Sequence, residues 1–128
     1  MSLLFKRRRR GRRRISNSEI LIRATDKILV DRLYLDARLK CIDVAKAIGT
    51  NRTYLWDAIR SRGFGFQEYL SKFRVRYFIE NAPFHTDLSC AEIAEMCGFN
   101  DAKSLNRYLK QLFGITLSEY MKKVARGL

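Results

Sequence analysis

Two short segments of the chain carry cationic, amide and hydroxyl side chains at a spacing that would gather them on one face of a helix. The first set is Arg52, Thr53, Trp56 and Arg60, and the second is Lys103, Asn106, Arg107 and Lys110. Arginine and lysine can pair with guanine edges, asparagine with adenine, and threonine through its hydroxyl or methyl group. The chemistry that these residue types predict is hydrogen bonding to base edges and phosphates, with no covalent bond made or broken.

The opposite face of each segment is apolar, as expected of a helix that packs on a small core. The inward residues are expected to be Leu55, Ala58 and Ile59 in the first segment, and Leu105, Tyr108, Leu109 and Leu112 in the second. Asp57 faces outward and would repel phosphate unless it accepts from a cytosine amino group or pairs with Arg60. Two interpretations of Trp56 stay open: contact with DNA or another protein, or packing back onto the lobe surface.

One pattern precedes both segments, in two copies that lie 49 residues apart. The copies span residues 42–49 and 91–98, and each has an alanine followed four residues later by a glycine. The small alanine lets two helices cross closely, and the glycine ends the first helix in a left-handed turn. Two copies in a short basic chain predict two helix-turn-helix motifs, each with its polar segment as the second helix.

The elements that would hold these motifs are all helical by periodicity, so the predicted fold class is all-α. A first helix is expected at about residues 18–33, followed by a short connection over 34–40. Its apolar face would consist of Leu21, Ala24, Ile28 and Leu29. The expected organisation is a basic arm or juxtamembrane flank over 1–15, a first helix-turn-helix lobe over 16–63, a connector helix within 64–83 and a second lobe over 84–128.

The connector is the longest predicted helix, over residues 66–81, and Pro83 ends it. Its apolar positions at helical spacing are Phe66, Tyr69, Leu70, Phe73, Tyr77 and Phe78. Residues suited to capping open the later helices: Asn51, Asp101, and the pairs Ser89 with Glu92 and Thr116 with Glu119. The first motif has Lys40 where the second has Ser89, so we expect its helix start to be less well fixed.

The positive charge of the chain is concentrated near its start. Lys and Arg number 26 against 13 acidic residues, and eight of the cations lie within residues 6–14, so the remainder carries only +5. Such a run is a phosphate-binding arm, a contact for anionic lipid or a solvated flank. Residues 3–5, Leu-Leu-Phe, resemble the cytoplasmic end of a membrane helix, which predicts an output module of a larger, membrane-anchored protein; a cloning remnant is the other interpretation.

Residue types needed for catalysis or metal binding are scarce and scattered. The lone histidine, His85, and the cysteines Cys41, Cys90 and Cys97 lack the tight ligand spacing of a zinc site. The sequence has neither a glycine loop that would cradle a phosphate nor a convergent pair of carboxylates. We therefore expect no enzyme activity, no metal and no cofactor, and the free thiols fit the cytoplasm.

Four motifs follow one another between about residues 20 and 125. They are Val44-Ala45 with Gly49 and Tyr54-Leu55; Phe66 with Tyr69-Leu70 and Arg74; Ile93-Ala94 with Gly98-Phe99; and Phe113-Gly114 with Thr116 and Tyr120. In order and spacing they resemble the DNA-binding domain of the AraC/XylS family of bacterial transcription regulators. The chain departs from that family's pattern at Leu117, where proline is usual, at Met121, where arginine is usual, and at Phe78, where a small residue is usual.

The resemblance implies two homeodomain-like helix-turn-helix lobes joined by a long helix, which bind adjacent major-groove segments of a promoter. Outward residues of both second helices would read bases, and Arg107 falls at a position that the family often uses for this. The partners implied are double-stranded DNA and RNA polymerase.

Two other classes of function stay open. In one, the arm over residues 1–15 binds polyanions or a membrane surface without specificity, and the helices only support it. In the other, the helical motifs dock proteins with Trp56 as the anchor, and Arg107→Ala changes DNA affinity little.

Overall fold

The computed structural model describes residues 15–127, and the secondary structure of this part of the chain is entirely helical. The elements are α1 (Asn17–Val30), η2 (Leu33–Leu35), α2 (Cys41–Ala47), α3 (Arg52–Arg60), α4 (Phe66–Asn81), η3 (Ala82–Phe84), α5 (Cys90–Met96), α6 (Ala102–Phe113) and α7 (Leu117–Ala125). The predicted all-α class is confirmed. None of these helices is long and apolar enough to cross a membrane. Residues 1–14 of the arm or membrane-proximal flank predicted over residues 1–15 lie outside the described residues, and Ile15 packs against the first core.

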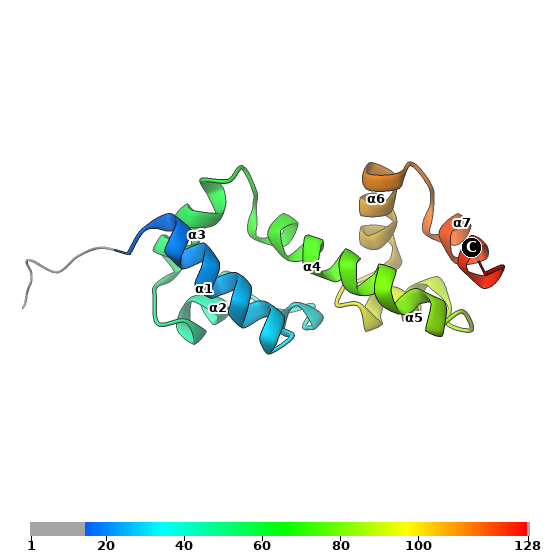
Figure 1. Ribbon diagram of the computed structural model, residues 1–128, viewed down its shortest axis with the longest axis horizontal. Helices are drawn as coiled ribbons and strands as arrows, with labels where there is room; N and C mark the ends of the chain where they lie inside the picture. The colour runs from blue at the N-terminus through cyan, green and yellow to red at the C-terminus, as the bar shows by residue number, and fades with distance from the viewer. Residues whose placement is uncertain (1–14, 128) are drawn as a thin grey trace, which may run out of the picture.

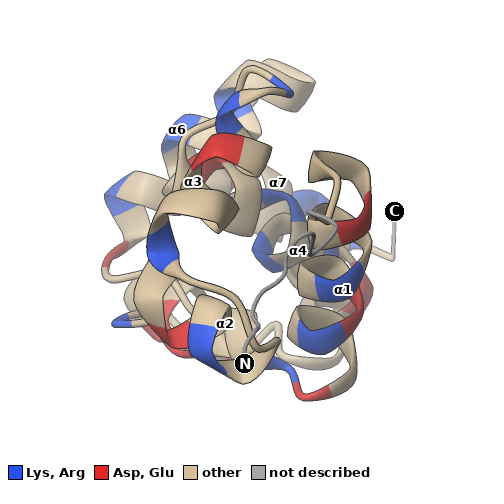
Figure 2. Ribbon diagram, turned by 90° about the vertical axis from the view of Figure 1, so that its left-hand side faces the viewer, with Lys and Arg blue, Asp and Glu red and all other residues tan. Residues whose placement is uncertain are grey.

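Helix α4 runs through the middle of the molecule, between two groups of helices (Figure 1). The pairs α2–α3 and α5–α6 form the two helix-turn-helix motifs, with left-handed turns at Gly49 (φ 77°) and Gly98 (φ 92°). Helices α3 and α6 both stand on the same side of α4, in the view of Figure 1 and in the perpendicular view of Figure 2. The two predicted recognition helices can therefore face one surface together.

Each lobe has its own hydrophobic core, and α4 contributes to both. Its residues in the first core are Phe66, Tyr69 and Leu70, and those in the second are Val75 and Phe78. Tyr77, between them, is half-buried and borders both cores. The sequence predicts one apolar stripe along α4, but Val75 lies outside that stripe and is buried. The reason is that the two lobes pack against different sides of the helix along its length.

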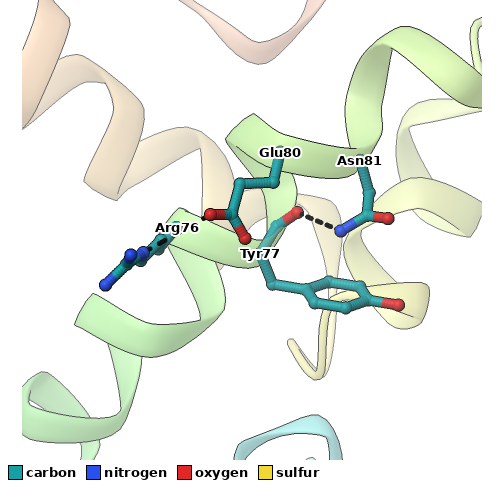
Figure 3. A network of polar contacts seen from close by, with 4 residues as sticks. All are labelled: Arg76, Tyr77, Glu80 and Asn81. Carbon is teal, nitrogen blue, oxygen red and sulfur yellow. Dashed lines mark hydrogen bonds and ion pairs between the residues drawn. The ribbon is translucent and has the colours of Figure 1, made fainter. Parts of the chain in front are cut away.

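The bounds of α4 agree with the prediction, and side chains close its last turn. Asn81 donates from Nδ2 to the carbonyl oxygen of Tyr77 at 2.8 Å (Figure 3). Arg76 and Glu80, in the same turn, form an ion pair of 3.5 Å between exposed side chains. Such a pair contributes less than about 1 kcal/mol to stability. Pro83 follows in η3, where the helix has already ended.

The predicted capping residues are confirmed by hydrogen bonds. The side-chain oxygens of Asn51, Ser89, Asp101 and Thr116 each accept from the amide three residues further on. The expectation of a loosely fixed α2 is wrong in part, because Asp43 Oδ2 accepts from the Lys40 amide at 2.9 Å. Half of the reciprocal capping arrangement is thus present at α2, and the half that needs a side-chain acceptor at Lys40 is missing.

Helix α1 ends three residues earlier than the periodicity predicts. Arg32 adopts a left-handed backbone conformation with φ 53°, which a continuing α-helix cannot include. The buried face of α1 also differs from the prediction. Leu29 is 42% exposed, and Ile20 is buried in its place. The buried face differs from the predicted one because α1 packs mainly on α3. The sequence does not show where α3 lies relative to α1.

A polar joint connects the two lobes, and Arg74 of α4 lies at its centre. This side chain is only 4% exposed. Its Nε donates to the carbonyl oxygen of Tyr34 at 2.6 Å, its Nη2 to that of Asp36 at 2.9 Å, and its Nη1 to Gln67 Oε1 at 3.1 Å. Gly98, in the turn of the second motif, packs against the main chain of Tyr34. The connection between α1 and α2 is therefore held by α4 and touches the second lobe.

Candidate nucleic-acid interface

The exposed face of α3 carries most of the contact residues predicted for the first motif. Arg52, Thr53 and Arg60 are exposed. Leu55, Ala58 and Ile59 are fully buried, as predicted for the inward face. Asn51 Oδ1 accepts from the Tyr54 amide at 2.9 Å and so closes the start of the helix with a side chain. The first turn of α3 is left at the surface, which is the part of a recognition helix that approaches base edges.

Trp56 is half-buried and packs against the first core. The guanidinium carbons of Arg52 and Arg60 lie 5.1 and 5.8 Å from the centroid of its ring. Such cation–π contacts hold long cationic side chains in place at an exposed site. Trp56 also borders a hollow of about 530 Å³ between α3 and the start of α4. Of the two interpretations left open, the structure favours packing onto the lobe, with the ring supporting the two arginines.

Helix α6 presents the more uniform cationic face. Lys103, Arg107 and Lys110 are all exposed and lie four and three residues apart, on one side of the helix. The guanidinium carbon of Arg107 lies 5.1 Å from the centroid of the Tyr108 ring. Gln111 is also exposed, four residues after Arg107, and was not predicted as a contact residue. The four-residue spacing between Gln111 and Arg107 places both on one face of the helix, and this spacing could have been read from the sequence.

The predicted inward face of α6 is only partly correct. Leu105 and Leu109 are fully buried, whereas Tyr108 is half-buried and Leu112 is 60% exposed. The last turn of α6 therefore projects past the second core. Helical spacing alone gives no information about where a core ends along the helix axis.

Asn106 has a partner within the chain. Its Oδ1 accepts from the amide of Leu117 at 2.8 Å, and the residue is half-buried. The structure therefore directs the Asn106 oxygen toward the start of α7. No pattern in the sequence indicates this contact, because it joins residues of two helices across a turn.

The charges around the two helices are mixed. Figure 2 shows basic residues on α3 and α6, and also on α1 and α2. Asp57 is exposed on α3, and Arg60 lies over the Trp56 ring. The ion pairs in the described part of the chain are Lys27–Asp31 and Arg76–Glu80, so Asp57 is not neutralised by Arg60. Helix α3 therefore presents less net positive charge than α6.

The thiols are packing groups in this structure. Cys97 is fully buried, and burial raises its pKa to about 12. Cys41 is also buried, which raises its pKa, whereas the equivalent Cys90 is half-buried. Within residues 15–127, no group of three or more His, Cys, Asp or Glu side chains is arranged to hold a metal ion.

Residues 44–123 match a protein family described as a helix-turn-helix domain. Over 90 residues the chain is 31% identical to the Msm operon regulatory protein of Streptococcus mutans, a match that covers 67% of this chain. The match spans 31% of the length of that protein.

Two solved structures show the same fold. One is a DNA-binding transcriptional dual regulator from Escherichia coli K-12, with a TM-score of 0.67, 16% identity, and coverage of 84% of this chain and 93% of that one. The other is a regulator with an AraC-type DNA-binding domain from Chromobacterium violaceum, with a TM-score of 0.65, 20% identity, and coverage of 84% and 94%. The chain belongs to the AraC/XylS family of helix-turn-helix transcription regulators.

Proposed function

We propose that α3 and α6 enter two adjacent major-groove segments on one side of a promoter duplex. The observation that carries this proposal is that both helices stand on the same side of α4, whose buried Arg74 binds the connection between α1 and α2. Two helix-turn-helix units on one face of DNA meet successive major grooves about one helical turn apart, roughly 34 Å. A single chain would then read a bipartite site.

The two helices contribute unequally in this proposal. On α6, Arg107 pairs with a guanine edge, and Lys103 and Lys110 contact bases or phosphates beside it. On α3, Arg52, Thr53 and Arg60 face the DNA, and Trp56 holds the two arginines in place. The exposed Asp57 limits phosphate binding by α3. The stronger part of the recognised sequence is therefore expected under α6.

We also propose that the chain serves as the DNA-binding output of a larger regulator. The support is its size relative to the Msm operon regulatory protein, of which it matches 31%. An antibody against residues 15–127 would report the size of the protein in cells, and fractionation would report whether it is anchored to the membrane. A species of about 15 kDa would contradict the larger regulator, and its presence in the soluble fraction alone would contradict the membrane anchor predicted from the sequence. Transcription in vitro with purified RNA polymerase, from a promoter that carries the binding site, would show whether the protein activates or represses.

The test of sequence-specific reading is the selection of binding sites from random duplex DNA. We would use the full chain at about 0.15 M salt, where weak surface electrostatics are screened. A matched variant carries glutamine at all eight cationic positions of residues 6–14 and leaves the described helices unchanged. Both proteins are expected to select one motif in two blocks, with the variant binding more weakly.

Other outcomes identify the alternative functions. If only the unmodified chain binds, and it enriches no motif, the arm is a polyanion binder and the proposal fails. If both proteins select a single block, only one lobe reads DNA, and the bipartite part of the proposal is wrong.

A further inference from the structure

A side chain from α6 satisfies the first amide of α7. Leu117 is the first residue of α7, so its amide has no carbonyl partner within its own helix. Asn106 Oδ1 accepts from this amide at 2.8 Å. Because the donor is an N–H group, the oxygen of Asn106 must face it, and not the side-chain NH₂. Leu117 is 2% exposed, so water does not readily replace this partner.

The remaining contacts of α7 fix it locally and to α4. Thr116 Oγ1 accepts from the Glu119 amide at 3.1 Å, and Glu119 Oε1 accepts from the Thr116 amide at 2.8 Å. The ring of Tyr120 packs on Phe78 of α4, with centroids 5.1 Å apart. The Asn106 bond therefore links α6 to a helix that is itself packed on the connector. Helix α6 also packs directly on α5 and α4, and the Asn106 bond adds a polar contact to this packing.

The same bond conflicts with base reading by Asn106. An asparagine that recognises adenine accepts from N6 through Oδ1 and donates to N7 through Nδ2 at the same time. Here Oδ1 is occupied by a neighbouring amide. Building on the proposed function, we propose that Asn106 is a positioning residue that sets the direction of α6. The base and phosphate contacts of this helix are then made by Lys103, Arg107 and Lys110, which are exposed.

The residue at position 117 explains the need for this asparagine. Proline there would have no N–H group, and Asn106 Oδ1 would have nothing to accept. The backbone is suited to proline, because Leu117 is the first helical residue and Thr116 before it is extended, with φ −80° and ψ 161°. Leu117→Pro therefore removes the donor with little change in the backbone, and the Asn106 side chain must rotate away from the proline Cδ, which takes the place of the amide hydrogen.

The test is a double-substitution cycle with four full-length proteins: the unmodified chain, Asn106→Ala, Leu117→Pro and the double variant. Asn106→Ala should raise the unfolding equilibrium constant of the unmodified chain about tenfold, since it leaves a buried amide unpaired. In the Leu117→Pro background it should change that constant by less than about twofold. The leucine side chain lost from the core is common to both proteins of that pair, so it cancels. Equal effects in the two backgrounds would overturn the proposal.

Site selection from random DNA gives a second readout, which a purely structural role would leave unchanged. Relative to the unmodified chain, Asn106→Ala is expected to weaken the preference in the block under α6, whereas the double variant and Leu117→Pro are expected to select the same motif at every position. A base pair whose preference disappears only when Asn106 is replaced means that Asn106 reads that base, and the positioning role is wrong. If the unmodified chain selects no motif, the proposed function fails, while the stability cycle still decides whether the Asn106 bond exists.

Amide hydrogen exchange covers the case in which Leu117→Pro does not fold. The Leu117 amide is compared with the Glu119 amide, which keeps its own partner in Thr116. In Asn106→Ala, exchange at Leu117 should accelerate about tenfold more than exchange at Glu119. Equal acceleration at both amides contradicts the assigned hydrogen bond.

Discussion

A side-chain carbon placed on Gly98 would overlap the carbonyl oxygen of Tyr34, so the turn of the second helix-turn-helix lies directly against the main chain of the first lobe. The same oxygen accepts from Arg74 Nε at 2.6 Å. One carbonyl is thus the meeting point of both lobes and the connector helix. Because the contact at Gly98 is between main chains, rotation of a side chain cannot relieve it. The joint therefore restrains how α3 and α6 are directed relative to each other.

Gly98→Ala should destabilise the protein more than the equivalent Gly49→Ala. Both glycines have left-handed backbones, with φ 92° and 77°. A carbon added to Gly49 has nothing within 4 Å, so that substitution costs only the backbone strain of about 1–2 kcal/mol. At Gly98 the overlap with Tyr34 adds about 1–3 kcal/mol. Urea unfolding of both variants measures the difference, and equal losses would mean that the lobes separate at little cost.

Arg74→Ala should cost about 3 kcal/mol, since it leaves the carbonyl groups of Tyr34 and Asp36 without their donor. Arg76→Ala, on the same helix, is the matched control. Its side chain is 74% exposed and pairs only with Glu80, so the expected loss is below about 1 kcal/mol. Urea unfolding distinguishes the two. If Arg74→Ala lowered the free energy of unfolding only slightly, the buried guanidinium would not be needed to join the lobes.

The elements that the sequence predicts well are those fixed by local rules. The bounds of α4 follow from its spacing and Pro83, and the caps at Asn51, Asp101 and Thr116 follow from residue type. These interactions join residues within four positions of each other, so helical periodicity and capping rules are enough to predict them.

The features that the sequence does not give are tertiary. Leu112 has the right spacing for burial but lies beyond the end of the second core. Asn106 has the right residue type for base reading, but its oxygen has a partner eleven residues away, across a turn. Burial of Arg74 depends on the path of the chain at Tyr34, which no periodicity encodes.

Arg107→Ala should weaken binding to the selected site by about 10- to 100-fold and relax the preference at one base pair. The control is Arg23→Ala on α1, which removes the same charge from an exposed position outside the two predicted recognition helices. Its effect should be smaller and independent of sequence. Fluorescence anisotropy would measure the affinity of both variants for the selected duplex and for a scrambled duplex. Equal losses for both variants would contradict base reading by Arg107.

The buried thiols should resist modification in the native protein. Burial raises the pKa of Cys97 to about 12, so its thiolate is scarce at about pH 8, and it is also inaccessible. Cys90 is half-buried and should react first with a thiol reagent, as peptide mapping after a timed reaction will show. The raised pKa also means that stability falls as pH rises through the ordinary thiol value, because the unfolded chain ionises first. Modification of Cys97 before Cys90 would contradict the packing described.

Acid should destabilise the protein through its capping carboxylates. Hydrogen bonds from Ser89, Ser104 and Thr116 hold the pKa values of Glu92, Asp101 and Glu119, respectively, below the ordinary range. A carboxyl group with a lowered folded pKa stabilises the protein above its unfolded pKa, and this contribution is lost as pH falls through the folded value. Urea unfolding between about pH 6 and pH 3 should show declining stability. The triple Gln/Asn/Gln variant at these positions should lose part of that dependence, and an unchanged profile would contradict this origin.

The most direct test of the account is a change in the spacing between the two blocks of the selected DNA site. Insertion of about five base pairs, half a helical turn, moves the second block to the opposite side of the duplex. If α4 and its joint hold α3 and α6 rigidly on one side, affinity should fall to that of a site with one block alone. Affinity that stays unchanged after the insertion would show that the two helices do not read DNA as one rigid unit.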